Sequence, residues 1–183
     1  MKKIVAVLLL VLSVVSIAAC SKETGGGSKD LDVGIVLPTK DEPRWLQDQE
    51  RFEDVLADTD YSVEVLFSQG SSANEKTNVE TLVARGIDVL IICAHDAAAA
   101  GASVEAAKEA GITIISYDRL ITDTEAIDYY VTFDSISVGE AMGQYLVDNA
   151  SDSGNPLYLY AGAATDNNAF LFFEGAWNIL QPK

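Results

Sequence analysis

The chain has 183 residues, of which 49% are hydrophobic and 22% are charged, and its formal net charge at pH 7 is −16. This composition is that of a globular protein rather than a disordered one. The strong negative charge argues against nucleic acid as a partner, because binding to phosphates needs a basic face.

The N-terminus predicts an export signal. Lys2 and Lys3 precede an apolar run that is too short for a spanning helix and that ends in small residues. The stretch 17–20 (IAAC) resembles the bacterial lipobox, in which the leader is cut before the cysteine and a diacylglycerol is attached to it. An ordinary signal peptide with an incidental cysteine is the alternative. We expect residues 1–19 to be a signal peptide, and residues 20–30 to be a lipidated Cys20 with a flexible linker.

From Leu31 onward, short apolar runs alternate with longer amphipathic stretches. Strands are predicted at residues 31–37, 61–67, 87–94, 112–117 and 127–133, and helices at 44–59, 73–86, 97–111 and 137–150. The run at 87–94 is typical of a parallel strand buried on both faces, and Gly86 and Gly111 are expected to end their helices. This β-α-β-α order predicts an α/β fold with a doubly wound parallel sheet and right-handed crossovers.

A further strand at 157–164 and a helix at 167–183 are predicted after a turn. The helix has large apolar side chains to bury, namely Phe170, Phe172, Phe173, Trp177, Ile179 and Leu180. One strand with one or two helices cannot bury enough surface to offset chain entropy. We therefore expect the sequence to be the N-terminal part of a longer protein, cut early in a second lobe.

The sequence lacks motifs for cofactors, metals and covalent catalysis. It contains no GxGxxG turn, no GxxxxGK[ST] phosphate loop and no nucleophile elbow. Cys93 lies in an apolar run and is expected to be a small buried thiol. We expect no cofactor, no disulfide and no metal site.

Polar side chains follow the carboxyl ends of the predicted strands, where open parallel sheets bind their ligands. The chain there reads PTKDEPRW, AHD, YDR, FDS and AATDNN. A carboxylate such as Asp118 accepts from neighbouring hydroxyls, Arg119 offers a rigid fork of donors, and Asn168 does both. Trp45 could present an apolar face to the C–H side of a pyranose. These residues suit a polyhydroxylated ligand.

Each of these residues also has a structural alternative. Asp118 and Arg119 could form a surface ion pair with each other, which would be worth little energetically. Trp45 could pack in the core behind its helix. His95, the single histidine, could be a loop residue without a ligand, and Asp96 could cap the helix that follows.

Several stretches together resemble periplasmic sugar-binding proteins of the type I fold: VGIVLPTKDEPRWLQDQ, ARGIDVLIICAHDA, AKEAGITIISYDRLI, DYYVTFDSISVGEAMGQYLV and GAATDNNAFLFFEGAWNILQP. The likeness is to the xylose-binding and multiple-monosaccharide-binding branch that serves ABC importers. The motifs RW, YDR and DNNA carry it by their order and spacing. It implies two α/β lobes that close over one sugar, with the N-terminal lobe at 31–135 and the beginning of the second at 136–183.

The resemblance also implies the site residues. The sugar-binding positions of the family fall on Arg44, Trp45, Asp118, Arg119, Asp166 and Asn168. Asp134 matches a position near the first crossing between the lobes, where a hinge role and a sugar contact are both open. His95 and Asp96 are further candidates for either role. Pro43 stands where a polar residue is expected before the arginine.

The resemblance implies capture of a ligand rather than chemistry. The expected protein is an exported monomer, anchored by lipid at the outer face of the cell membrane or located in the periplasm. It would deliver a monosaccharide of the xylose, glucose, galactose or arabinose class to an ABC permease. A sensory role, in which bound sugar is presented to a chemoreceptor or sensor kinase, is the alternative. A second alternative is a LacI-type effector domain, which would be cytosolic, whereas this chain begins with an export signal. A third is an enzyme that uses Asp118 and His95 as an acid-base pair, but no nucleophile, metal or cofactor motif supports it.

Overall fold

The computed structural model describes residues 31–150, 154 and 156–181. Its strands are β1 (Val33–Leu37), β2 (Val63–Phe67), β3 (Val89–Ile92), β4 (Thr113–Tyr117) and β5 (Tyr129–Val131), and its helices are α2 (Pro43–Ala57), α3 (Ser72–Ala84), α4 (Gly101–Glu109), α5 (Ser135–Asn149) and α6 (Asn167–Leu180). No helix within these ranges has the length and apolar character needed to cross a bilayer. The predicted leader and Cys20 lie outside the described residues.

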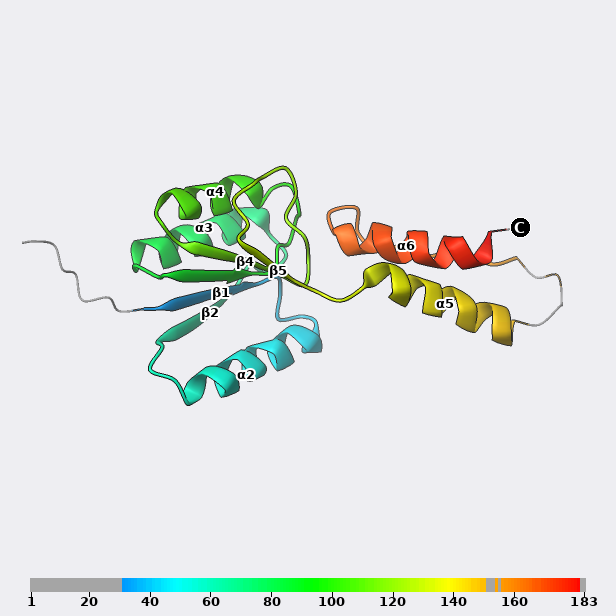
Figure 1. Ribbon diagram of the computed structural model, residues 1–183, viewed down its shortest axis with the longest axis horizontal. Coiled ribbons are helices and arrows are strands. Elements are labelled where there is room, and N and C mark those ends of the chain that lie inside the picture. Colours follow the sequence, from blue (N-terminus) through cyan, green and yellow to red (C-terminus); the bar gives the residue numbers. More distant parts are fainter. Residues whose placement is uncertain (1–30, 151–153, 155, 182–183) are drawn as a thin grey trace, which may run out of the picture.

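The strands form one parallel sheet in the order β2-β1-β3-β4-β5. Helix α2 covers one face, and α3 and α4 cover the other (Figure 1). The α2 side packs Trp45 and Phe52 against β1, while the opposite side packs Leu82 and Val104 against the sheet. This is the doubly wound α/β architecture that the sequence predicts.

The helix ends follow the local sequence signals. The Ser71 side chain accepts the Asn74 backbone N–H at 3.4 Å and caps α3. Gly86 and Gly111 follow α3 and α4 with left-handed φ values of 79° and 87°, which glycine adopts at little cost. Helix α4 begins later than predicted, because residues 97–100 form a separate turn.

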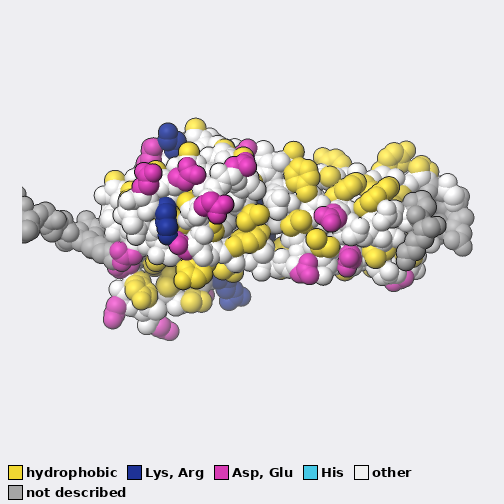
Figure 2. Space-filling view, turned by 45° about the horizontal axis from the view of Figure 1, so that its top comes forward, with side chains coloured by type: hydrophobic (Ala, Val, Ile, Leu, Met, Phe, Trp, Pro, Cys, Tyr) yellow, Lys and Arg dark blue, Asp and Glu magenta, His cyan; other side chains and the backbone are white. Residues whose placement is uncertain are grey.

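Helices α5 and α6 pack against each other to one side of the sheet (Figure 1). Glycines permit the close approach: a Cβ at Gly175 would lie 2.1 Å from the Ile136 carbonyl oxygen. The predicted strand at 157–164 is wrong for this structure, since the segment is exposed and has no strand pairing. A strand needs a neighbour for its backbone groups, and none of the described segments lies in register beside it. Exposed hydrophobic side chains gather over this part of the molecule (Figure 2).

A buried carboxyl group lies behind the carboxyl edge of the sheet. Glu75, in the first turn of α3, is 1% exposed. Its Oε2 accepts the His95 backbone N–H at 2.8 Å and the Ser68 hydroxyl at 3.4 Å, whereas its Oε1 has no hydrogen-bond partner in the described part of the chain. Burial raises the pKa of Glu75 to about 7, although the hydrogen bonds from His95 and Ser68 oppose the shift.

This pKa predicts a pH-dependent stability. The folded chain binds the Glu75 proton more tightly than the unfolded chain, whose glutamate has an ordinary pKa of 4.5. The stabilising effect of the protonated form is therefore complete below about pH 4.5 and is lost as the pH rises through about 7, a change on the order of 3 kcal/mol. Glu75→Gln should remove this slope in urea unfolding measured from pH 4.5 to 8. Glu80→Gln, on the exposed side of α3, is the matched control, and an unchanged slope in Glu75→Gln would contradict the assignment.

Candidate functional site

Loops at the carboxyl ends of β1, β3 and β4 meet beside the point where the strand order reverses. In the order β2-β1-β3-β4-β5 this switch lies between β1 and β3, and open α/β sheets bind ligands in the crevice outside it. The loop after β1 leads into α2, the loop after β3 into α4, and β4 ends directly before Asp118. The N-terminus of α6 approaches the same edge, because Ala97 N–H donates to the Thr165 carbonyl at 2.9 Å.

The first turn of α2 carries Arg44 and Trp45. Pro43 occupies the first helical turn, where its fixed φ favours helix initiation and its missing N–H has no cost. The Trp45 indole is 2% exposed, donates from Nε1 to Glu42 at 2.9 Å and packs beside Cys93 in the α2-side core. Trp45 therefore packs in the core, which is the structural alternative given above, rather than presenting its face to solvent. Cys93 is a buried free thiol, as expected.

Two guanidinium groups lie over the Trp45 ring. The Arg44 Cζ is 4.3 Å and the Arg119 Cζ is 5.4 Å from the ring centroid. Cations at these distances are attracted by the negative face of an indole. Trp45 is thus an apolar support that holds two hydrogen-bond donors at the edge of the sheet.

The turn after β4 has a strained backbone at Asp118. The residue has a left-handed φ of 64°, and the Arg119 N–H closes the turn on the Tyr117 carbonyl at 2.7 Å. Such a conformation costs on the order of 1–3 kcal/mol for a residue with a side chain and persists only where neighbours enforce it. Here the Asp118 N–H donates to the Val131 carbonyl, and the Thr132 hydroxyl donates to the Asp118 carbonyl at 2.9 Å.

The Asp118 carboxylate is the buried acceptor of the site. Its side chain is 6% exposed; Oδ2 accepts from Arg44 Nη2 at 2.6 Å and Oδ1 accepts from Asn168 Nδ2 at 3.3 Å. Burial disfavours the charged form of Arg44, but the hydrogen bond and the charge of Asp118 outweigh it and raise the Arg44 pKa. The alternative of an ion pair between Asp118 and Arg119 is not the arrangement seen, because Asp118 pairs with Arg44 of α2.

Arg119 contacts the N-terminus of α6. Its Nε lies 2.9 Å from Asp166 Oδ2, and its Nη1 donates to the Ala94 carbonyl at 3.2 Å. The other Asp166 oxygen caps α6 by accepting the Asn168 N–H at 3.0 Å. The Asn168 side chain is buried, where it donates to the Asp118 carbonyl and accepts the Ser135 hydroxyl. The sugar-binding residues implied by the resemblance therefore form one cluster of contacts.

The further candidates stand apart from this cluster. His95 is held through its backbone N–H by Glu75, and Asp96 Oδ1 accepts from Ala98 N–H and Ala99 N–H, so it caps the turn before α4. Asp134 is exposed between β5 and α5, where it caps α5 by accepting the N–H and hydroxyl of Ser137. These hydrogen bonds lower the Asp134 pKa.

Sequence reasoning missed three side chains that contact the cluster. Glu42 accepts from Trp45, while Asp48 lies 3.4 Å from Arg44 Nε and accepts from the Tyr117 hydroxyl at 3.1 Å. The signal for Asp48 was available, because a residue four positions after Arg44 lies on the same face of a helix. Tyr117 belongs to the YDR motif, but the motif did not indicate its contact with Asp48, which depends on how β4 meets α2.

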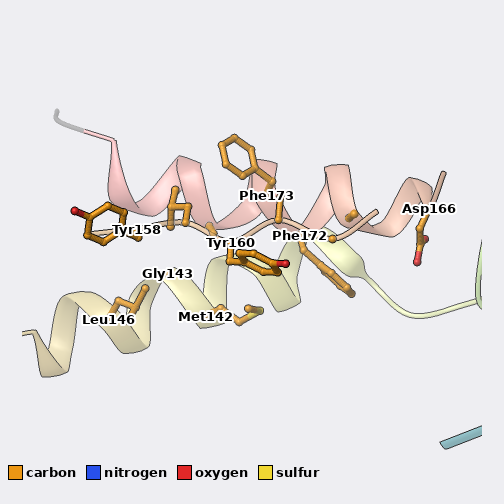
Figure 3. A pocket seen from close by; sticks show the side chains of 13 residues that line it. Met142, Gly143, Leu146, Tyr158, Tyr160, Asp166, Phe172 and Phe173 are labelled. Carbon is orange, nitrogen blue, oxygen red and sulfur yellow. The ribbon is translucent and has the colours of Figure 1, made fainter. Parts of the chain in front are cut away.

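A separate hollow of about 350 Å³ lies between α5, α6 and residues 158–162 (Figure 3). Its labelled side chains are mostly aromatic or aliphatic, with Asp166 at one end. A sugar needs several hydrogen-bonding groups, so this hollow suits it less well than the Asp118 cluster does. Within the described ranges, no three His, Cys, Asp or Glu side chains are grouped to hold a metal ion.

Comparisons of this chain with protein families and with individual known proteins agree on one family. The sequence pattern of the family described as periplasmic binding protein domain matches residues 33–183 of this chain. A multiple sugar-binding periplasmic protein of Azospirillum brasilense is 36% identical over 154 residues, which are 82% of this chain and 43% of that protein. The D-xylose-binding periplasmic protein of Escherichia coli is 32% identical over 155 residues, which are 85% of this chain and 46% of that protein.

A solved structure is similar in both sequence and fold. The carbohydrate transporter solute-binding protein of Chloroflexus aurantiacus, in complex with D-glucose, is 70% identical with a TM-score of 0.79. The match covers 84% of this chain and 45% of that one. The chain thus spans slightly less than half the length of these relatives.

Asp166 should stabilise the junction between α6 and the sheet in two separable ways. Asp166→Asn keeps a capping oxygen but removes the charge that faces Arg119, whereas Asp166→Ala removes both. Loss of a cap costs about 1 kcal/mol, so Asp166→Ala should speed amide hydrogen exchange in the first turn of α6 by about fivefold. Asp166→Asn should have a smaller effect. Equal protection in the wild-type and Asp166→Ala chains would show that the junction does not depend on this residue.

Proposed function

The chain belongs to the periplasmic binding protein domain family, and on this premise we propose that it captures a monosaccharide and delivers it to an ABC permease. The observation that carries the proposal is the convergence of Arg44, Asp118 and Asn168 at the carboxyl edge of the sheet. Binding, rather than turnover, is the activity that this family performs.

In the proposed mechanism, sugar hydroxyls join a network that is already polarised. The Asp118 carboxylate accepts from adjacent hydroxyls, while Arg44 and Arg119 donate to hydroxyl or ring oxygens. Asn168 and Asp166 contribute from the N-terminus of α6. Trp45 supplies the apolar support beneath the donors. Because Asp118 is buried and fixed before the ligand arrives, little ordering is required on binding.

A pyranose of the glucose or xylose class is the proposed ligand. The Chloroflexus relative was solved with D-glucose, and the Escherichia coli relative binds D-xylose according to its name. These two sugars share their ring hydroxyl arrangement and differ by one hydroxymethyl group. Space for that group is worth only about 1–3 kcal/mol in an apolar pocket, so both sugars are candidates for the same site.

Residues 31–135 are proposed to form the N-terminal lobe, and residues 136–183 to begin the second lobe. The chain leaves the sheet after β5 and enters α5 at the Asp134 cap (Figure 1). A hinge here would let α5 and α6 move relative to the sheet and close over the sugar. Asp134 would then act at the hinge, and His95 and Asp96 would shape the neighbouring loop.

We further propose that the protein is exported and lipid-anchored through Cys20. The support is the basic and apolar leader followed by IAAC and a polar Gly-rich linker, together with relatives that are described as periplasmic. An outer-face anchor would keep the binding protein, as a monomer, close to its permease.

Sugar binding can be tested by titrating the purified chain from Leu31 onward with D-glucose and D-xylose. Saturable amide shift changes in NMR spectra should centre on Arg44, Asp118 and Asn168. Asp118→Asn is the sharpest variant, because asparagine tolerates the left-handed backbone while losing the charge. Hydrogen bonds to a charged acceptor contribute about 1.5–3 kcal/mol, so the affinity should fall at least tenfold.

Asp123→Asn is the matched control for that titration, since Asp123 is an exposed aspartate that also has a left-handed φ, of 59°. It should bind as the wild type does. Equal affinity in Asp118→Asn would remove Asp118 from the site, and shifts confined to Phe172 and Phe173 would place the ligand in the α5–α6 hollow instead.

The anchor has its own test. In a bacterial host that processes lipoproteins, the full sequence should appear in the membrane fraction, and its N-terminal peptide should carry the mass of a diacylglycerol. Cys20→Ser should release the protein from the membrane, while Cys93→Ser should leave its distribution unchanged. An unmodified N-terminal peptide in the wild-type protein would reject lipidation.

A further inference from the structure

Arg44 is the most exposed charged residue of the Asp118 cluster. Its side chain is 46% exposed, against 6% for Asp118 and 17% for Arg119. A single ion pair at such exposure is worth little and leaves a long side chain free to change rotamer. A sugar site that relies on the Arg44 guanidinium therefore needs a second contact to orient it.

Asp48 supplies that second contact. It lies one turn after Arg44 on α2, with its Oδ2 3.4 Å from Arg44 Nε, whereas a different nitrogen, Nη2, contacts Asp118 at 2.6 Å. The Asp48 side chain is only 17% exposed. An ion pair in this partly buried position is screened less by water and salt than a surface pair.

Tyr117 connects Asp48 to the strand that bears Asp118. The Tyr117 hydroxyl donates to Asp48 Oδ2 at 3.1 Å, and its ring packs edge-on against Phe52 of α2 at a centroid distance of 5.2 Å. Burial and the neighbouring Asp48 raise the Tyr117 pKa, so the phenol remains a donor over the physiological range. Asp48 is therefore fixed from β4 as well as from its own helix.

We propose that Asp48 and Tyr117 are positioning residues for Arg44, which orient its guanidinium between two carboxylates for contact with the ligand. The proposal rests on the proposed function, because only a sugar site gives the orientation a use. Asp48 lies 3.4 Å from Nε and Asp118 accepts from Nη2 at 2.6 Å, so two carboxylates hold two different nitrogens of the guanidinium. The arginine is then set before the ligand arrives, and the ordering cost on binding is reduced.

The test measures Arg44 directly in the absence of sugar, by following the exchange of its Nε–H with water in ¹⁵N NMR spectra of the chain. Asp48→Asn should speed this exchange at least fivefold, and Tyr117→Phe should speed it by a smaller factor. Asp54→Asn, an exposed change on the same helix, is the matched control and should have no effect. The Nε–H of Arg119, whose nitrogen forms an ion pair with Asp166, should exchange at an unchanged rate in all three variants, which separates positioning from general loosening of the fold.

Unchanged Arg44 exchange in both Asp48→Asn and Tyr117→Phe would overturn the proposal. A second measurement, the affinity for D-glucose, separates it from the proposed function. If Asp48→Asn frees Arg44 and weakens glucose binding about tenfold, with Asp54→Asn neutral, both are supported. If Arg44 is freed but the wild-type chain binds no glucose, the positioning role stands and the sugar assignment fails. If glucose binds equally well with Arg44 freed, the positioning role in binding is rejected.

Discussion

The carboxylate and carbonyl oxygens of Asp118 accept hydrogen bonds from α2, from Tyr130 of β5, from Thr132 just after β5 and from α6. Because the residue is 5% exposed and has a left-handed backbone, these contacts both fix and require its unusual conformation. An unpaired carboxylate here would be costly to bury. The arrangement of Arg44 and Asn168 follows from this constraint, since each supplies a donor to Asp118.

Each guanidinium of the cluster is paired with a carboxylate of the protein. Arg44 lies between Asp118 and Asp48, and Arg119 pairs with Asp166, while both guanidiniums lie over Trp45. A neutral polyhydroxylated ligand can exchange hydrogen bonds with such a network without introducing a buried charge. The Arg119–Asp166 ion pair and the Asn168–Asp118 hydrogen bond also connect the sheet edge to α6. The side chains proposed to contact the ligand are therefore the ones that join the two parts of the chain.

The sequence predicted the sheet well, because local signals determine it. The apolar run at 87–94 became the central strand β3, and Gly86 and Gly111 end their helices as expected. The predicted strand at 157–164 failed because strand formation depends on a neighbouring chain segment rather than on local pattern. The family resemblance identified the site residues, but it did not predict which of them contact one another. Asp118 pairs with Arg44 rather than Arg119, and Tyr117 and Asp48 meet only through the packing of α2 on β4.

The central claim is that the Asp118 cluster is the sugar site. The most direct test is a crystal structure of the protein grown with D-glucose. The account predicts a pyranose at the carboxyl edge of the sheet, with two adjacent hydroxyls on the Asp118 carboxylate and Arg44 within hydrogen-bond distance of the sugar. Glucose bound in the hollow between α5 and α6, with the Arg44–Asp118 pair unchanged, would contradict it.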